Sequence, residues 1–204
     1  MPSINKPKKI SLELQEWLSK GHAKTLQSLV AFSEENSFAF VLMLLLFVSS
    51  LPVPTAGITH VLELIAMVVA IEMIIGLKTI WLPGFMQRIK LGKTFQGKVI
   101  PVIIKRIQWF EKRSSPRLKW VFSTPLFNQL IGSVILVLVV AAFVAPPFSG
   151  LDTLPSLGVV IIGLAMILDD IVILFVGLLV GSVGLATILI FLDLVINNLK
   201  HLIN

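Results

Sequence analysis

The sequence predicts an all-α, polytopic integral membrane protein with about four to six membrane-embedded helices. Hydrophobic residues make up 56% of its 204 residues and only 14% are charged, whereas soluble domains carry about one quarter charged residues. Apolar runs of helical length recur along the chain, and most lysines and arginines lie in two segments outside these runs. A soluble core of this size would not bury so much apolar surface, so a bilayer is the expected solvent.

Composition and motifs also limit the chemistry. The chain contains no cysteine, which excludes disulfides, thiolate metal sites and cysteine nucleophiles. We find no nucleophile–base–acid arrangement, no glycine-rich phosphate loop after a strand and no metal-ligand spacing. We therefore expect a protein that is not an enzyme and that needs no metal or other cofactor. No cleaved signal peptide is expected, because the start of the chain lacks a short apolar core followed by a cleavage site.

Residues 1–36 are predicted to form a cytoplasmic, amphipathic N-terminal region. A helix is expected to begin at Ser11, with Leu14, Trp17 and Leu18 on one face. That face either packs against the rest of the protein or lies in the membrane interface.

Residues 37–77 are predicted to form the first membrane half. The apolar run over 37–51 provides about 14 helical residues, which rise only ~21 Å and fall short of the ~30 Å hydrocarbon core. The run meets Pro52 and Pro54, where a helix would lose backbone hydrogen bonds. The following run, 58–77, is long enough to cross. The first run is therefore either a short spanning helix or a re-entrant half-helix.

Residues 78–126 are predicted to be a basic amphipathic segment at the cytoplasmic surface. Eleven lysines and arginines in this segment stand against one acid, Glu111. Trp81, Trp109 and Trp120 alternate with the cations and are predicted to anchor the segment in the interface. Nucleic-acid binding also uses interleaved aromatics and cations, but beside apolar segments the charge is better matched to anionic lipid head groups. We expect no nucleic-acid partner.

Residues 127–204 are predicted to form the second membrane half and to repeat the pattern of the first. Two breaks stand 93 positions apart (147 − 54): Pro54 matches Pro147, and Gly57 matches Gly150. In each half a short apolar run precedes the break and another follows it. Paired segments interrupted by Pro and Gly indicate a transporter-like repeat with its site at the breaks. Two ordinary hairpin turns would contain the same residues, and both interpretations stay open.

The chain ends in a long apolar tail over 171–196, which is long enough to cross once with tilt. Gly181 and Gly184 would alternatively allow it to fold into a tight helical pair. Small residues such as Gly177, Gly181 and Gly184 also let helices of two copies approach closely, so we expect a homodimer.

Ionisable residues within apolar segments are costly and usually indicate function or a buried pair. His60 and Glu63 share a helical face just after the first break, either as a proton-linked pair or as an interfacial helix start. Glu72 is flanked by apolar residues and is predicted to face a bundle interior, a dimer seam or a cavity. Asp152 lies beside the second break and is predicted to cap the next helix. The candidate transport or cavity site comprises Pro52, Pro54, Gly57, His60, Glu63, Glu72, Pro147, Gly150 and Asp152.

Three stretches carry a resemblance to a known family: LPVPTAGITHVLELIAMVVAIEMIIG, IWLP, and FVAPPFSGLDTLPSLGVVIIGLAMILDD. Over about residues 10–195 the chain resembles the ExoD exopolysaccharide synthesis family of bacterial membrane proteins. The resemblance implies a small, multi-pass protein of the bacterial inner membrane that supports exopolysaccharide production, and it implies no catalytic residues. Family members often have Gln where this chain has Glu72, which weakens an essential role for that acid.

Two functions agree with these features. In the first, a transporter-like or lipid-handling protein uses the two breaks as its site, with Glu63 and Glu72 as proton-sensitive groups. In the second, a non-transporting scaffold docks polysaccharide synthesis proteins through the basic segment and the N-terminal helices. Since both basic regions, 1–36 and 78–126, should be cytoplasmic, the two halves are expected to be parallel repeats. If residues 38–51 do not cross the bilayer and 58–77 do, the repeats are inverted instead, and one basic region lies outside, contrary to the positive-inside rule.

Overall fold

The described part of the chain folds into helices joined by turns, which confirms the predicted all-α class. Its regular elements are helices, with isolated backbone bridges between Thr25 and Lys90 and between Arg117 and Asp170 but no strand. The computed structural model describes residues 10–19, 25, 27–28, 37–51, 58–77, 79–81, 84, 88, 90, 92, 95–114, 117, 119–146 and 149–203. The elements are α1 (Ile10–Ser19), α3 (Ser37–Ser49), α4 (Ile58–Ile75), a π-helical turn η1 (Phe95–Val99), α6 (Ile100–Glu111), α7 (Lys119–Phe122), α8 (Pro125–Val144), α9 (Thr153–Leu168) and α10 (Ile171–Ile203).

The helices α3, α4, α8 and α9 form a four-helix core, in which each packs against two of the others. The packed pairs are α3 with α4, α3 with α9, α4 with α8 and α8 with α9. Gly132 near the start of α8 meets Met73 near the end of α4, and Gly163 in the second half of α9 meets Ala39 near the start of α3. These neighbours therefore run antiparallel. The ends of α3 and α8 and the starts of α4 and α9 consequently lie at one end of the core.

The helices α4 and α9 end in the same way. Gly76 and Asp169 follow the two helices in left-handed conformations, with φ of +83° and +52°. The next residue in each case, Leu77 or Asp170, donates its N–H to the carbonyl five positions earlier, at 3.1 and 3.0 Å. This is the hydrogen bond that closes a helix at a left-handed C-terminal residue. The two left-handed residues stand 93 positions apart (169 − 76), the offset of the two breaks.

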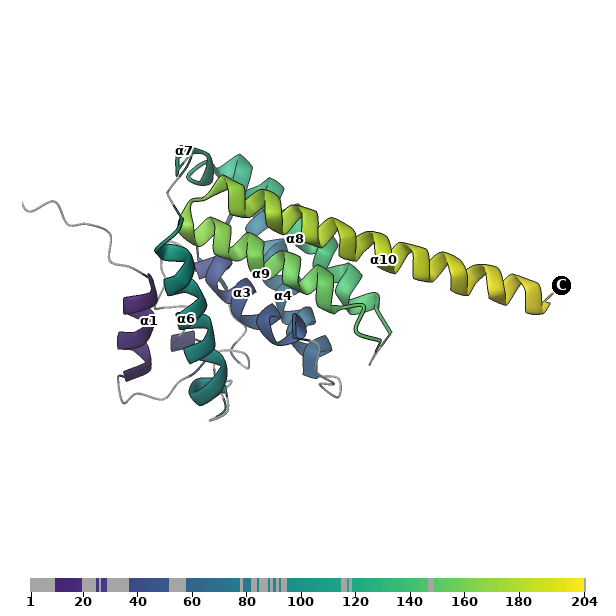
Figure 1. Ribbon diagram of the computed structural model, residues 1–204, viewed down its shortest axis with the longest axis horizontal. Helices are drawn as coiled ribbons and strands as arrows, with labels where there is room; N and C mark the ends of the chain where they lie inside the picture. Colours follow the sequence, from purple (N-terminus) through teal and green to yellow (C-terminus); the bar gives the residue numbers. More distant parts are fainter. Residues whose placement is uncertain are drawn as a thin grey trace, which may run out of the picture.

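The helices α1 and α6 lie side by side at the end of the core opposite the breaks, and they run across the direction of α9 and α10 (Figure 1). The backbone N–H and hydroxyl of Ser11 donate to the two carboxylate oxygens of Glu111, at 3.1 and 2.6 Å. Leu14 and Trp17 are buried in the core. The predicted apolar face of the N-terminal helix therefore packs against protein.

The last helix, α10, packs along α9 through small residues and then extends past the core (Figure 1). A Cβ on Gly158 of α9 would lie 2.5 Å from the Cα of Gly181, and Cβ atoms on Gly177 and Gly184 would also meet the α9 segment closely. Since α10 is continuous through these glycines, the alternative in which the tail folds into a tight pair is wrong. The glycines mediate a contact within one chain, and the homodimer stays a prediction.

Among the described residues, two helices combine the length and the apolar composition needed to cross a bilayer: α8 over Pro125–Val144, and α10 over Ile171–Asn198. The apolar helices α3 and α9 are shorter, at 13 and 16 residues. The structure thus supports membrane association through two helices. The count of four to six embedded helices stays a prediction.

The close approach of α9 and α10 predicts that Gly158→Ala destabilises the protein. The added methyl group meets backbone atoms of Gly181, which have no rotamer by which to move away. We expect the free energy of unfolding to fall by about 1–3 kcal/mol, the usual cost of overpacking. The measurement is thermal unfolding of the purified protein in one detergent.

Gly97→Ala is the matched control for this experiment, because a Cβ at Gly97 has nothing within 4 Å. Its stability should stay equal or rise slightly, since alanine favours a helical backbone. Equal unfolding midpoints for the two variants would contradict the close contact.

Candidate functional site

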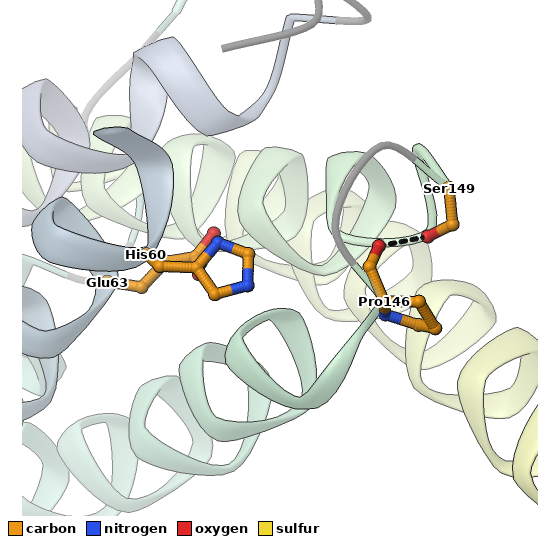
Figure 2. A network of polar contacts seen from close by, with 4 residues as sticks. All are labelled: His60, Glu63, Pro146 and Ser149. Atoms are coloured by element: carbon orange, nitrogen blue, oxygen red, sulfur yellow. Dashed lines mark hydrogen bonds and ion pairs between the residues drawn. The ribbon is translucent and has the colours of Figure 1, made fainter. Parts of the chain in front are cut away.

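Polar residues that follow the two breaks meet at one end of the four-helix core. The ring of His60, in the first turn of α4, packs on Phe143 near the end of α8, with 5.5 Å between the ring centroids. Asp152, which precedes α9, is near enough to interact electrostatically with both His60 and Glu63. Figure 2 shows His60 and Glu63 on α4 beside the turn that contains Pro146 and Ser149. The structure thereby brings together three of the predicted site residues from two halves of the chain.

Glu63 is the most enclosed member of this polar cluster. Its side chain is 0% exposed, and neither carboxylate oxygen has a hydrogen-bond partner among the described residues. The Nδ1 atom of His60 lies 3.9 Å from Oε2. The hydroxyl of Ser49, at the end of α3, lies near the carboxylate without reaching hydrogen-bond geometry. Buried polar groups are normally satisfied, so an unsatisfied group of this kind requires a functional or structural explanation.

Sequence reasoning did not single out two serines near this end of the core, Ser49 and Ser156. Both are buried, and their hydroxyls have no hydrogen-bond partner in the part of the chain that the structure describes. Ser156 lies one turn beyond Asp152 on α9, and its N–H donates to the Asp152 carbonyl at 3.1 Å. The 93-residue offset aligns Glu63 with Ser156 (63 + 93), so the repeat was the signal that would have identified this residue.

The second break contains a compact turn between α8 and α9. The hydroxyl of Ser149 donates to the carbonyl of Pro146 at 2.7 Å (Figure 2). The same hydroxyl accepts the N–H of Leu151 at 3.2 Å. Gly150 has φ +71°, a left-handed conformation that favours glycine. Asp152 occupies the N-cap position of α9, but its side chain makes no capping hydrogen bond, so the predicted side-chain cap is wrong.

Four predicted site residues, Pro52, Pro54, Gly57 and Pro147, lie outside the described residues. The turn at Gly150 is therefore the part of the two breaks whose conformation is described.

Glu72 does not join the polar cluster at the breaks. It lies near the other end of α4, is 6% exposed, and accepts the backbone N–H of Trp81 through Oε2 at 2.8 Å. Its burial agrees with the prediction that it faces inward. Its contact, however, is with the chain that enters the basic segment. The structure thus separates the two glutamates that sequence reasoning had assigned to one site.

Asp170 organises the turn between α9 and α10. Its carboxylate accepts the hydroxyl of Ser114 at 2.8 Å and the N–H of Val172 at 2.9 Å, while Arg117 donates its N–H to the Asp169 carbonyl at 2.9 Å. Burial raises the pKa of Asp170, but these hydrogen bonds and the charge of Arg117 together outweigh it, so the pKa lies below its ordinary value. Asp170 caps α10 and also ties the basic segment to the core.

The three tryptophans predicted as interfacial anchors are all exposed. Trp81 is 66% exposed, Trp109 49% and Trp120 71%. Such exposure is typical of aromatic residues at a membrane surface or a protein interface, and rare for residues of a soluble core.

The described part of the chain is all-helical, with two helices of membrane-spanning length and a buried polar cluster at one end of its core. These features indicate the class of small helical proteins that associate with membranes. More narrowly, the chain belongs to the ExoD family, because the family model described as "Exopolysaccharide synthesis, ExoD" matches residues 10–190. Membership connects the chain with exopolysaccharide synthesis.

The chain is also similar to "Uncharacterized protein slr1875" of Synechocystis sp. (strain ATCC 27184 / PCC 6803 / Kazusa). The two are 27% identical over 189 residues, which cover 89% of this chain and 84% of that protein. No solved structure matches the chain.

The environment of Asp170 predicts a pH-dependent contribution to stability. Since folding lowers the pKa of this carboxyl, its stabilising effect is fully present above the unfolded value of 3.8 and is lost as pH falls through the folded value. We expect Asp170→Asn to unfold at a lower temperature than the parent at about pH 7. The difference between the unfolding temperatures of the parent and of Asp170→Asn should become smaller as pH falls below about 4.

The measurement is the unfolding midpoint of both proteins over a pH series. Ser114→Ala, which removes one hydrogen bond to the carboxylate, should lower the midpoint less than Asp170→Asn. A gap that stays constant down to about pH 3 would show that Asp170 does not contribute through its charge.

Proposed function

We propose that the chain is a multi-pass protein of the bacterial inner membrane that supports exopolysaccharide synthesis as a transporter-like or lipid-handling protein, and not as an enzyme. The observation that carries this proposal is the enclosed carboxyl of Glu63, which lies where the two halves of the core meet. Family membership supports the connection with exopolysaccharide. A buried polar cluster between broken helices is the arrangement in which many transporters place their sites.

The exposed apolar surface supports a lipid environment for more than the two longest helices. Only 39% of the most apolar stretch of α8, and 28% of that of α10, is buried inside the protein. Val137 of α8 and Phe175 and Leu179 of α10 are more than half exposed. Because α4 and α9 pack directly on these helices, and α3 packs on α4 and α9, all three share the same environment. Five embedded helices result, within the predicted range of four to six.

Helix lengths support breaks that lie within the membrane. α3 and α9 have 13 and 16 residues, or about 20 and 24 Å, against a hydrocarbon core of about 30 Å. Gly184 of α10 meets the start of α9, yet the apolar part of α10 continues to Asn198. This is roughly 20 Å beyond the level of the second break. The apolar stretch of α10 thus extends further than the shorter helices α3 and α9, as expected if α3 and α9 are parts of re-entrant segments.

Several matches support a duplicated helical hairpin. Exchanging α3 with α8 and α4 with α9 leaves the set of packed helix pairs unchanged. The breaks and the left-handed ends of α4 and α9 share the offset of 93 residues. Since α3 and α8 run in the same direction, the repeats are parallel. Both breaks then face the outer side, and α1 and α6 face the cytoplasm, in agreement with the positive charge of residues 78–126, which include α6.

In this proposal, Glu63 is the proton-sensitive group of the site, and His60 and Asp152 are its electrostatic partners. Glu72 is assigned to holding Trp81. The scaffold alternative assigns function instead to the basic segment and α1, which lie together at one end of the core and would dock polysaccharide synthesis proteins.

The placement of the breaks predicts the accessibility of single cysteines in this cysteine-free chain. Ser149→Cys should react with a membrane-impermeant maleimide from outside, because Ser149 is exposed in the turn of the second break. A fluorophore at this position should be quenched by lipids brominated on the acyl chain, because the turn lies within the bilayer. Lys112→Cys, beside α6, should react only after the membrane is permeabilised.

Reaction of both cysteines from the same side would overturn the orientation. Reaction of Ser149→Cys from outside without quenching by the brominated chains would make the second break an ordinary hairpin turn. The scaffold alternative would then be favoured.

The separation of the two glutamates predicts that they respond differently to loss of charge. In a strain that lacks its own copy, Glu63→Gln should lower exopolysaccharide output by roughly tenfold or more, equivalent to ~1.4 kcal/mol in rate. Glu72→Gln is the matched control, because glutamine keeps an oxygen that accepts the Trp81 N–H, and it should retain the output. Both variants are first compared for abundance in the membrane. Full output from Glu63→Gln at equal abundance would refute a role of its charge.

A further inference from the structure

One face of α6 carries an exposed stripe of cations on the side opposite its buried apolar residues. Ile100, Ile103 and Ile107 are buried on the inner side. Val102 and Trp109 are 45% and 49% exposed on the outer side. Exposed cations flank these two residues at spacings of three and four, and within α6 this spacing places Lys105 and Arg106 on the same face. The α6 stripe consists of these two cations, of Lys98 in the π-helical turn η1 before the helix, and of Lys112 and Arg113 directly after it.

Local contacts hold the α6 stripe in place and leave it positive. The acid of this helix, Glu111, is engaged by the N–H and hydroxyl of Ser11 and so anchors α1. The guanidinium of Arg113 lies 4.1 Å above the ring of Trp109, and Trp109 packs edge-on against the half-buried Phe110. Cation and indole therefore form one outward-facing unit.

The position of α6 suits a membrane surface. α6 runs across the direction of α9 and α10 (Figure 1), so it lies along the bilayer plane when those helices cross it. Ser114, three residues past α6, is hydrogen-bonded to Asp170 at the start of α10. The stripe is thus tied to the level at which a membrane-length apolar helix begins.

We propose that the α6 stripe binds the phosphates of anionic phospholipids in the cytoplasmic leaflet. The five cations extend over roughly 20 Å along α6 and the turns on either side of it, and this spread fits a row of head groups better than a single free phosphate. Exposed Val102 and Trp109 among the cations match the mixed chemistry of the interface, where apolar side chains enter between head groups. The proposal rests on the membrane placement given above and is independent of transport.

Trp109 itself provides the probe. The background is Trp81→Phe/Trp120→Phe, which changes two exposed residues. The fluorescence of Trp109 is the difference between this protein and one with the further change Trp109→Phe. The full chain is reconstituted with equal mole fractions of phosphatidylglycerol and phosphatidylcholine, of which one or the other is brominated. We expect stronger quenching when phosphatidylglycerol carries the bromine.

This preference should be lost in Lys105→Gln/Arg106→Gln/Arg113→Gln and kept in Lys200→Gln, which removes an exposed cation at the far end of α10. One Lys or Arg near an anionic surface contributes about 1 kcal/mol, or about fivefold in local preference. Equal quenching by the two lipids, or loss of the preference in Lys200→Gln as well, would overturn the proposal. If soluble polyglutamate at matched charge abolishes the preference for phosphatidylglycerol, the proposal is overturned, and the stripe is instead a surface for acidic proteins.

If neither lipid quenches Trp109, the membrane placement itself is wrong. The labelling of Ser149→Cys and Lys112→Cys reports on that placement separately.

Discussion

The antiparallel packing of each core helix against two others is the constraint on which the rest of the structure depends. Because α4 lies against both α3 and α8, its first turn reaches the end of α8, where His60 contacts Phe143. The same packing brings Asp152 near Glu63 although 89 residues separate them (152 − 63). One end of the core therefore collects polar groups from both halves. The other end receives every connection that enters or leaves the basic segment.

The two glutamates of α4 show how position along one helix determines the role of an acid. Glu72 lies where the helix ends, and a backbone N–H that leaves the core satisfies its carboxylate. Glu63 lies where the core is closed on all sides, and the described residues offer it no hydrogen bond. A buried carboxyl group without hydrogen bonds is unfavourable for folding. Its presence at the junction of two halves is therefore better explained by function than by stability, whereas Glu72 has a structural explanation.

The sequence predicted those features that depend on neighbouring residues along the chain. Apolar runs and prolines located the helices and their interruptions, and helical spacing identified the buried face of Leu14 and Trp17. Contacts between distant segments were beyond such reasoning. Nothing near Gly181 in sequence shows that it faces Gly158, and nothing near Ser114 shows that it binds Asp170. The cap predicted at Asp152 failed because a preference for residue type does not fix the direction of a side chain.

The proposed duplication, and the differences between the polar residues of the two halves, together bear on how the proposed site works. A duplicated hairpin by itself would place identical groups on either side of the centre of the core. Here the acid Glu63 is matched by Ser156, and Asp152 is matched by Thr59 (59 + 93), so each half contributes its carboxyl at a different level. In the proposed site, the enclosed carboxyl would respond to a proton or a cation, while the aligned position of the other half contributes a neutral hydroxyl. Charge at the site therefore changes the interactions of α4 without an equal change on α9. The shared backbone geometry keeps the two halves packed while their polar groups differ. Because of this difference, we expect a change of charge at the proposed site to alter the packing of α4 more than that of α9.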